Sequence, residues 1–125
     1  SAKCNNELLT NILSEDEVKK IASDTMVGGA TLTKLLGTSA WYAPGASVSY
    51  LVNAIVNDTK EVLPCSVFLE GEYGVKDLCI GVPVKIGKNG FEEVVQLDLN
   101  NKDLEMFQNS VSAVKETNSA LDGLI

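Results

Sequence analysis

The chain has 125 residues, of which 45% are hydrophobic and 22% charged, so it is long enough to form one domain around its own core. No apolar run approaches the roughly 20 residues that a membrane span requires. The net charge is −7 and the lysines are scattered, which excludes a basic surface for nucleic acid. We therefore expect one soluble domain over residues 1–125, with neither nucleic acid nor membrane as a partner.

The chain contains no His, and all ten of its basic residues are Lys. It therefore lacks His, whose side chain titrates near neutral pH, and Arg, whose side chain binds carboxylates and phosphates bidentately. Three cysteines, Cys4, Cys65 and Cys79, form no C-x-x-C pair and leave one thiol over, which favours free thiols in a reducing, cytoplasmic compartment. No metal site is predicted. Five lysines are interpreted as solvated residues of turns, helix ends and strand edges: Lys34, Lys60, Lys76, Lys85 and Lys88.

The first predicted helix begins at Ser14 and runs to about Leu36. Ser14 and Glu17 have the spacing of a capping box, and apolar residues follow at intervals of three and four. Gly28 and Gly29 lie inside this helix, where each costs about 1 kcal/mol relative to Ala. We interpret them as a place of close backbone approach, favouring a tightly packed neighbouring helix over a ligand.

The segment GTSAWYAPGAS, residues 37–47, joins this helix to the next. Surface connections usually carry Asn, Asp or Ser, whereas Trp41 and Tyr42 stand here among small apolar residues, so the segment is predicted to be buried. Pro44 is interpreted as the first position of a second helix that ends near Asn57.

Three strands follow, with predicted core faces formed by Leu63, Cys65, Val67 and Leu69, then Leu78, Ile80, Val82, Val84 and Ile86, then Val95, Leu97 and Leu99. A turn near Glu72 and Tyr73 is predicted to pair Val67 with Leu78 and Cys65 with Ile80. A second turn at Asn89 and Gly90 is predicted to pair Val84 with Val95 and Val82 with Leu97. Both registers give an antiparallel meander with Cys65 and Cys79 on opposite faces.

A last amphipathic helix opens at Asn100 or Asn101 and needs one partner surface, either the meander or another subunit. The fold class predicted is α+β, a three-stranded antiparallel meander packed with helices. The chain has no P-loop, and no G-x-G-x-x-G follows a predicted strand.

Four segments together carry a family resemblance: GTSAWYAPGAS, LPCSVFLEGEYGVKD, CIGVPVKIGKNGFEEVVQLDLN and FQNSVSAVKE. The spacing of L-x-G-E-Y-G-x-x-D and G-V-P-x-x-[IL]-G-x-x-G is specific. From about Asn11 to Asn118 the chain resembles the carboxyl-terminal half of an NAD-dependent malate dehydrogenase of the lactate-dehydrogenase-like type. Lactate dehydrogenases resemble this chain more weakly, because the segment S-A-W-Y-A-P, with its small residues and its Pro, is typical of the malate dehydrogenases.

The resemblance implies a lactate/malate dehydrogenase carboxyl-terminal-domain fold and a parent enzyme of the tricarboxylic acid cycle that transfers hydride between NAD and malate or oxaloacetate. It also implies that Ser39, Ala40 and Pro44 line the pocket near substrate and nicotinamide, while Trp41 and Tyr42 mostly pack. The family's amino-terminal dinucleotide-binding domain, its substrate arginines and its Asp/His pair find no match, so this chain is predicted to be inactive alone, to hold no catalytic residue and to bind no cofactor. A homo-oligomeric parent is expected. The alternative is a free-standing, non-catalytic domain that assembles or binds a partner.

Overall fold

The structure is a computed structural model that describes residues 3–5 and 7–121. The chain divides into two compact units, one up to Val48 and one from Ser49 onwards. The sequence-based expectation of one domain stays a prediction.

The first unit opens with two short paired strands, β1 (Lys3–Cys4) and β2 (Glu7–Leu8), and a short helix, α1 (Leu9–Ile12), none of which the sequence pattern predicts. The long helix α2 (Glu15–Leu36) follows, and its bounds agree with the prediction. None of the residues of α2 is buried.

Local contacts fix both ends of α2. Ser14 is the N-cap: its Oγ accepts a hydrogen bond from the Glu17 backbone N–H at 3.4 Å, and its own N–H donates to Glu17 Oε2 at 2.9 Å. The predicted capping box is therefore confirmed. The Ser14 hydroxyl, which donates to Glu17 Oε2 at 2.7 Å, and the Ser14 N–H together lower the pKa of the Glu17 carboxyl. Gly37 ends the helix at φ 69°, the left-handed conformation that Gly adopts without strain.

The helix α3 (Tyr42–Val56) begins two residues earlier than the predicted start at Pro44. Its first turn is closed by the Gly45 N–H, which donates to the Trp41 carbonyl at 2.8 Å. Pro44 still lies inside the first turn, where a missing N–H leaves no intrahelical bond unmade. In the carboxyl-terminal part of the helix, Ala54 is buried in the core of the second unit.

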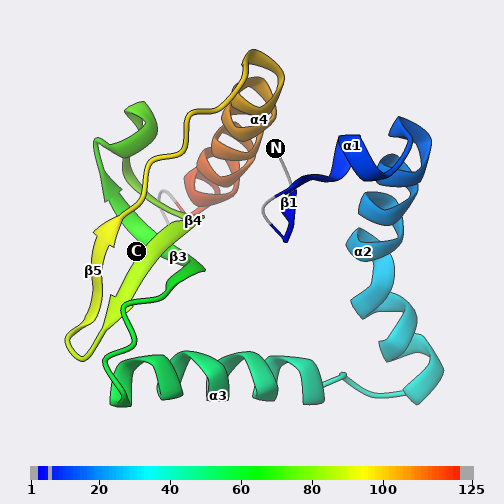
Figure 1. The fold of residues 1–125 in the computed structure, drawn as a ribbon, viewed down its shortest axis with the longest axis horizontal. Coiled ribbons are helices and arrows are strands. Elements are labelled where there is room, and N and C mark those ends of the chain that lie inside the picture. The colour runs from blue at the N-terminus through cyan, green and yellow to red at the C-terminus, as the bar shows by residue number, and fades with distance from the viewer. Residues whose placement is uncertain (1–2, 6, 122–125) are drawn as a thin grey trace. The chain divides into compact units, whose positions relative to one another are not determined.

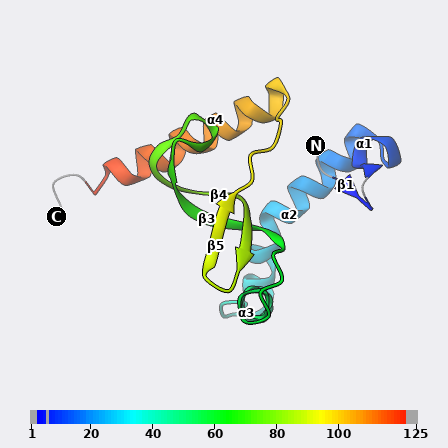
Figure 2. The same cartoon turned by 60° about the vertical axis from the view of Figure 1, so that its left-hand side comes forward.

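The second unit is built on the predicted meander, with strands β3 (Val62–Glu70), β4 (Lys76–Gly87) and β5 (Gly90–Val94) in the order β3-β4-β5, all antiparallel (Figures 1 and 2). The helix α4 (Asn101–Ser119) contacts β4, with Val111 buried and Phe107 and Val114 packed against the core. The meander is thus the partner of the last helix. The buried core consists of one face of β3 and β4 with single residues from the helices and the β3–β4 connection: Ala54, Val67, Leu69, Val75, Leu78, Ile80, Val82, Val84, Ile86 and Val111.

The predicted faces of β3 and β4 are confirmed, but the predicted partners are wrong by two residues. Val67 lies opposite Ile80 rather than Leu78, and Cys65 lies opposite Val82. The cause is a longer connection, which contains the 3-10 turn η1 (Glu72–Gly74), and a bulge in which Asp77 is the extra residue at φ 58°. A shift of two preserves the faces, since side chains alternate with period two. Cys65 is accordingly half-buried and Cys79 exposed on the other face, and all three thiols are free, as predicted.

The predicted register of β4 with β5 is wrong by one residue. Val84 pairs with Val94, not Val95, because Glu92 forms a bulge on β5 and the turn residues are Lys88 and Asn89. The strand ends at Val94, which packs on the core, while Leu97 is 50% exposed. The predicted core face of Val95, Leu97 and Leu99 is therefore not formed.

Candidate functional site

The three predicted pocket residues lie together where α2 gives way to α3. After the left-handed Gly37, residues 38–41 form a short connection that is neither helix nor strand, and α3 starts at Tyr42. Ser39 and Ala40 stand on this connection, and Pro44 stands in the first turn of α3. The structure thus brings all three onto one short stretch of backbone between two helix ends.

The side chains of this stretch are more exposed than the sequence predicts. Ala40 is half-buried, whereas Ser39 and Pro44 are exposed. Trp41 is 60% and Tyr42 80% exposed, and their two rings contact each other in a tilted arrangement, with centroids 6.2 Å apart. The prediction that this segment is buried is wrong for this chain. The physical reason is that the adjoining helix α2 buries none of its residues, so the described part of the first unit forms no core beside the connection.

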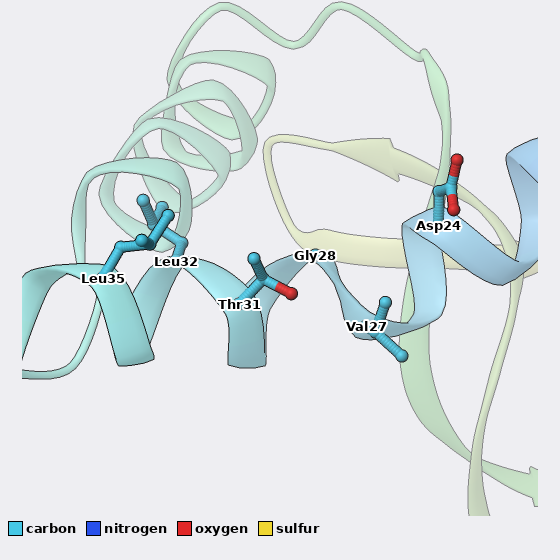
Figure 3. Close-up of a pocket in the computed structure, with 6 residues that line it drawn as sticks. All are labelled: Asp24, Val27, Gly28, Thr31, Leu32 and Leu35. Carbon is cyan, nitrogen blue, oxygen red and sulfur yellow. The ribbon is translucent and has the colours of Figure 1, made fainter.

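The predicted close approach at Gly28 and Gly29 is also not found. A Cβ placed on either glycine meets no atom within 4 Å among the described residues. A hollow of about 380 Å³ lies over this part of α2, lined from that one helix by Asp24, Val27, Gly28, Thr31, Leu32 and Leu35 (Figure 3). Asp24, its single charged residue, is hydrogen-bonded to Lys20 at 2.8 Å. The hollow is therefore a mostly apolar surface without a cluster of groups for chemistry.

Two side chains that commonly transfer protons or bind anions are absent from the sequence. The sequence has no His and no Arg. Over residues 3–5 and 7–121, no three His, Cys, Asp or Glu side chains lie close enough to hold a metal ion. What Ser39, Ala40 and Pro44 can offer a ligand is shape, because their small side chains stand where α2 gives way to α3.

Sequence reasoning missed one charged cluster, in the second unit. Lys60, interpreted as solvated, forms ion pairs with Asp58 at 2.8 Å and with Glu92 at 2.5 Å. Hydrogen bonds from Lys60 and from the Lys88 backbone N–H lower the pKa of Asp58, and hydrogen bonds to Asp58 and Glu92 raise the pKa of Lys60. The spacing of Asp58 and Lys60 hints at a local pair, but Glu92 is 32 residues away and carries no such signal.

Comparison with protein families settles the affiliation. The sequence model described as the lactate/malate dehydrogenase, alpha/beta C-terminal domain matches residues 5–121. The chain belongs to the lactate/malate dehydrogenase family. The lactate/malate dehydrogenase carboxyl-terminal fold predicted from the sequence is thereby confirmed.

Curated members of the lactate/malate dehydrogenase family are similar over nearly the whole chain. The malate dehydrogenase of Flavobacterium johnsoniae is 59% identical over 117 residues, which cover 94% of this chain and 38% of that protein. Malate dehydrogenase 1 of Aquifex aeolicus is 40% identical, covering 94% of this chain and 36% of that protein. The chain thus spans less than two fifths of the length of these relatives.

Solved structures of the lactate/malate dehydrogenase family agree with the fold. The malate dehydrogenase of Salinibacter ruber matches 98% of this chain and 40% of its own, with a TM-score of 0.92 and 36% identity. The lactate dehydrogenase of Eimeria maxima, solved with NADH and oxamate, matches 92% of this chain and 36% of its own, with a TM-score of 0.85 and 32% identity. Among the described residues, no helix combines the length and apolar character needed to cross a bilayer.

Proposed function

We propose that this chain is the carboxyl-terminal part of an NAD-dependent malate dehydrogenase that interconverts malate and oxaloacetate, as an enzyme of the tricarboxylic acid cycle. The observation that carries the proposal is the 59% identity with a protein named malate dehydrogenase, which extends over 117 residues. The alternative, a free-standing partner-binding domain, has no comparable observation in its favour.

In this proposal Ser39, Ala40 and Pro44 form part of the wall of the substrate pocket. Small side chains suit that role because they leave room for a small dicarboxylate and for the flat face of a nicotinamide ring. The left-handed Gly37 and the first turn of α3 hold the stretch at its two ends. A wall of this kind orients the substrate and excludes water rather than moving protons.

The residues present fit only part of NAD. The short apolar stretch around Ala40 suits the nicotinamide ring, and NAD, when bound, supplies the hydride acceptor. Its phosphates need a glycine-rich turn at a helix N-terminus, and the substrate carboxylates need cationic clamps, for which this chain has neither the motif nor an Arg. We assign those groups and the catalytic acid/base to the amino-terminal dinucleotide-binding part of the parent.

The exposed apolar surface of α2 supports a further assignment, to contacts with the rest of the parent and with other subunits. None of the α2 residues is buried in the described structure, and Met26 and Leu35 are 86% and 79% exposed. Surfaces of this kind mark interaction sites. The three free thiols support a cytoplasmic location for the homo-oligomeric parent.

The test is to substitute Ala40→Leu in the full-length protein and to measure malate oxidation. A larger side chain on a pocket wall crowds the substrate, so we expect kcat/KM to fall by about tenfold or more. Ala113→Leu, an exposed position on α4, is the matched control and should leave kcat/KM unchanged. A full-length protein without malate dehydrogenase activity would contradict the proposed function. An active full-length protein whose kcat/KM does not change in Ala40→Leu would contradict only the assignment of Ala40 to the pocket.

A further inference from the structure

The connection between α3 and β3 has an unusual backbone. Asp58 and Lys60 both have positive φ, at 50° and 58°. Residues other than Gly rarely adopt this conformation, which persists only where surrounding contacts hold it. Contacts with the rest of the second unit are therefore expected to hold this connection in place.

Three of its residues are tied to the hairpin of β4 and β5. Lys60 Nζ lies 2.8 Å from Asp58 Oδ1 and 2.5 Å from Glu92 Oε1 on β5. The Lys88 N–H, in the hairpin turn, donates to Asp58 Oδ1 at 2.8 Å. The Ile86 N–H, on β4, donates to the Glu61 carbonyl at 2.8 Å. The connection thus holds both strands of the hairpin and its turn.

Gly87 explains how these groups fit together. It is buried, and a Cβ built on it would overlap Glu92 Oε1 and lie 2.6 Å from Lys60 Nζ. Its backbone does not have a positive φ, so an alanine would conflict only with the ends of the Glu92 and Lys60 side chains, which would have to move apart. The Lys60–Glu92 pair is therefore closed directly over this glycine.

We propose that Asp58, Lys60 and Glu92 form an electrostatic latch, closed over Gly87, that fastens the tip of the β4–β5 hairpin and can open without unfolding the rest of the sheet. Among the described residues, apolar packing does not hold the tip, because the buried core residues of β4 end at Ile86. Beyond Ile86 the hairpin is held by polar contacts. Segments with few buried apolar contacts open locally, so the hairpin tip can open on its own.

The latch is accessible to solvent and ions. The side chains of Lys60, Asp58 and Glu92 are 41%, 38% and 25% exposed. Salt therefore screens the ion pair, whereas it has little effect on the apolar core below. This inference concerns the second unit alone and does not depend on the proposed function.

The test is hydrogen exchange by NMR on the 125-residue chain, read at the amides of Lys88 and Ile86. Lys60→Met removes the charge, and Gly87→Ala displaces the pair sterically without changing any charge. Each should speed exchange at Lys88 by at least about threefold. The double variant should exchange no faster than the faster single variant, because both changes open one latch.

Two controls sharpen the result. Lys115→Met on α4 makes the same charge change away from the latch and should leave the Lys88 amide unaffected. Added salt should speed exchange at Lys88 in the natural sequence but not in Lys60→Met. Unchanged Lys88 exchange in Lys60→Met, additive effects in the double variant, or an equal increase around Val67 in the β3–β4 ladder would each overturn the latch.

Discussion

Tyr73, in the connection between β3 and β4, contacts both the segment that follows β5 and the helix α4. Its hydroxyl donates to the Val95 carbonyl at 2.7 Å and accepts from the Leu97 N–H at 2.8 Å, and its own N–H donates to Gln96 Oε1 at 3.0 Å. Its ring lies 5.2 Å from that of Phe107 on α4. These contacts hold the chain just after β5 has left the sheet, and they account for a left-handed φ of 54° at a residue with a large side chain.

Tyr73→Phe should therefore destabilise the chain. The substitution removes one hydroxyl and leaves the Val95 carbonyl and the Leu97 N–H without that partner, for an expected loss of about 1–2 kcal/mol in the free energy of unfolding. Urea denaturation measures this. Tyr50→Phe is the matched control, since Tyr50 is 54% exposed and its hydroxyl bonds only Glu61, at 2.6 Å, among the hydrogen bonds described. Equal stabilities of the two variants would contradict the role given to Tyr73.

The helix α2 depends on its own local contacts, because it buries no residue. Ser14→Ala removes the N-cap and should cost about 1 kcal/mol of helix stability. The Ser14 hydrogen bonds lower the folded-state pKa of Glu17, so their stabilisation is present above the ordinary pKa of Glu and is lost as pH falls through the lowered value. NMR titration should show the Glu17 pKa rising toward its ordinary value in Ser14→Ala. A Glu17 pKa that does not move would contradict this account.

From α2 to α4 the helices and strands themselves follow from the sequence, although β1, β2 and α1 do not, and the pairing of the strands in the meander does not follow from it. Ser14, Gly37 and Asn100 mark helix ends in the structure because capping is local chemistry. The strand registers fail at Asp77 and Glu92, each the extra residue of a bulge. Bulges depend on contacts across the fold, such as the ion pair of Lys60 with Glu92, and no local pattern encodes them.

The candidate site could be predicted only through the family resemblance. Ser39, Ala40 and Pro44 carry no catalytic group, so nothing in their chemistry distinguishes them from an ordinary helix connection. The burial predicted for Trp41 and Tyr42 failed because burial depends on what lies against a residue, and the described residues bring no core to these rings.

For the molecule as a whole, the exposed apolar surface predicts self-association of the isolated chain. The large exposed hydrophobic residues up to Val48 are Leu8, Ile12, Ile21, Met26, Val27, Leu32, Leu35, Leu36, Trp41, Tyr42 and Val48. Sedimentation at micromolar concentration should show species larger than a monomer, and Leu35→Lys should weaken them by placing a charge on that surface. A monomer throughout, with no binding of a hydrophobic dye, is the result that counts against this prediction.

We propose that this chain is part of a malate dehydrogenase and depends on the rest of that enzyme for catalysis. The chain has neither His nor Arg. Loss of a well-placed general base typically costs about 10²- to 10⁴-fold in rate, and loss of positioning can cost a further 7–11 kcal/mol or so. The most direct measurement follows formation of reduced cofactor from NAD and malate, with the 125-residue chain and the full-length protein assayed side by side. We predict turnover by the full-length protein and none above the buffer blank for the chain; turnover by the chain that survives repurification, or an inactive full-length protein, would contradict the account.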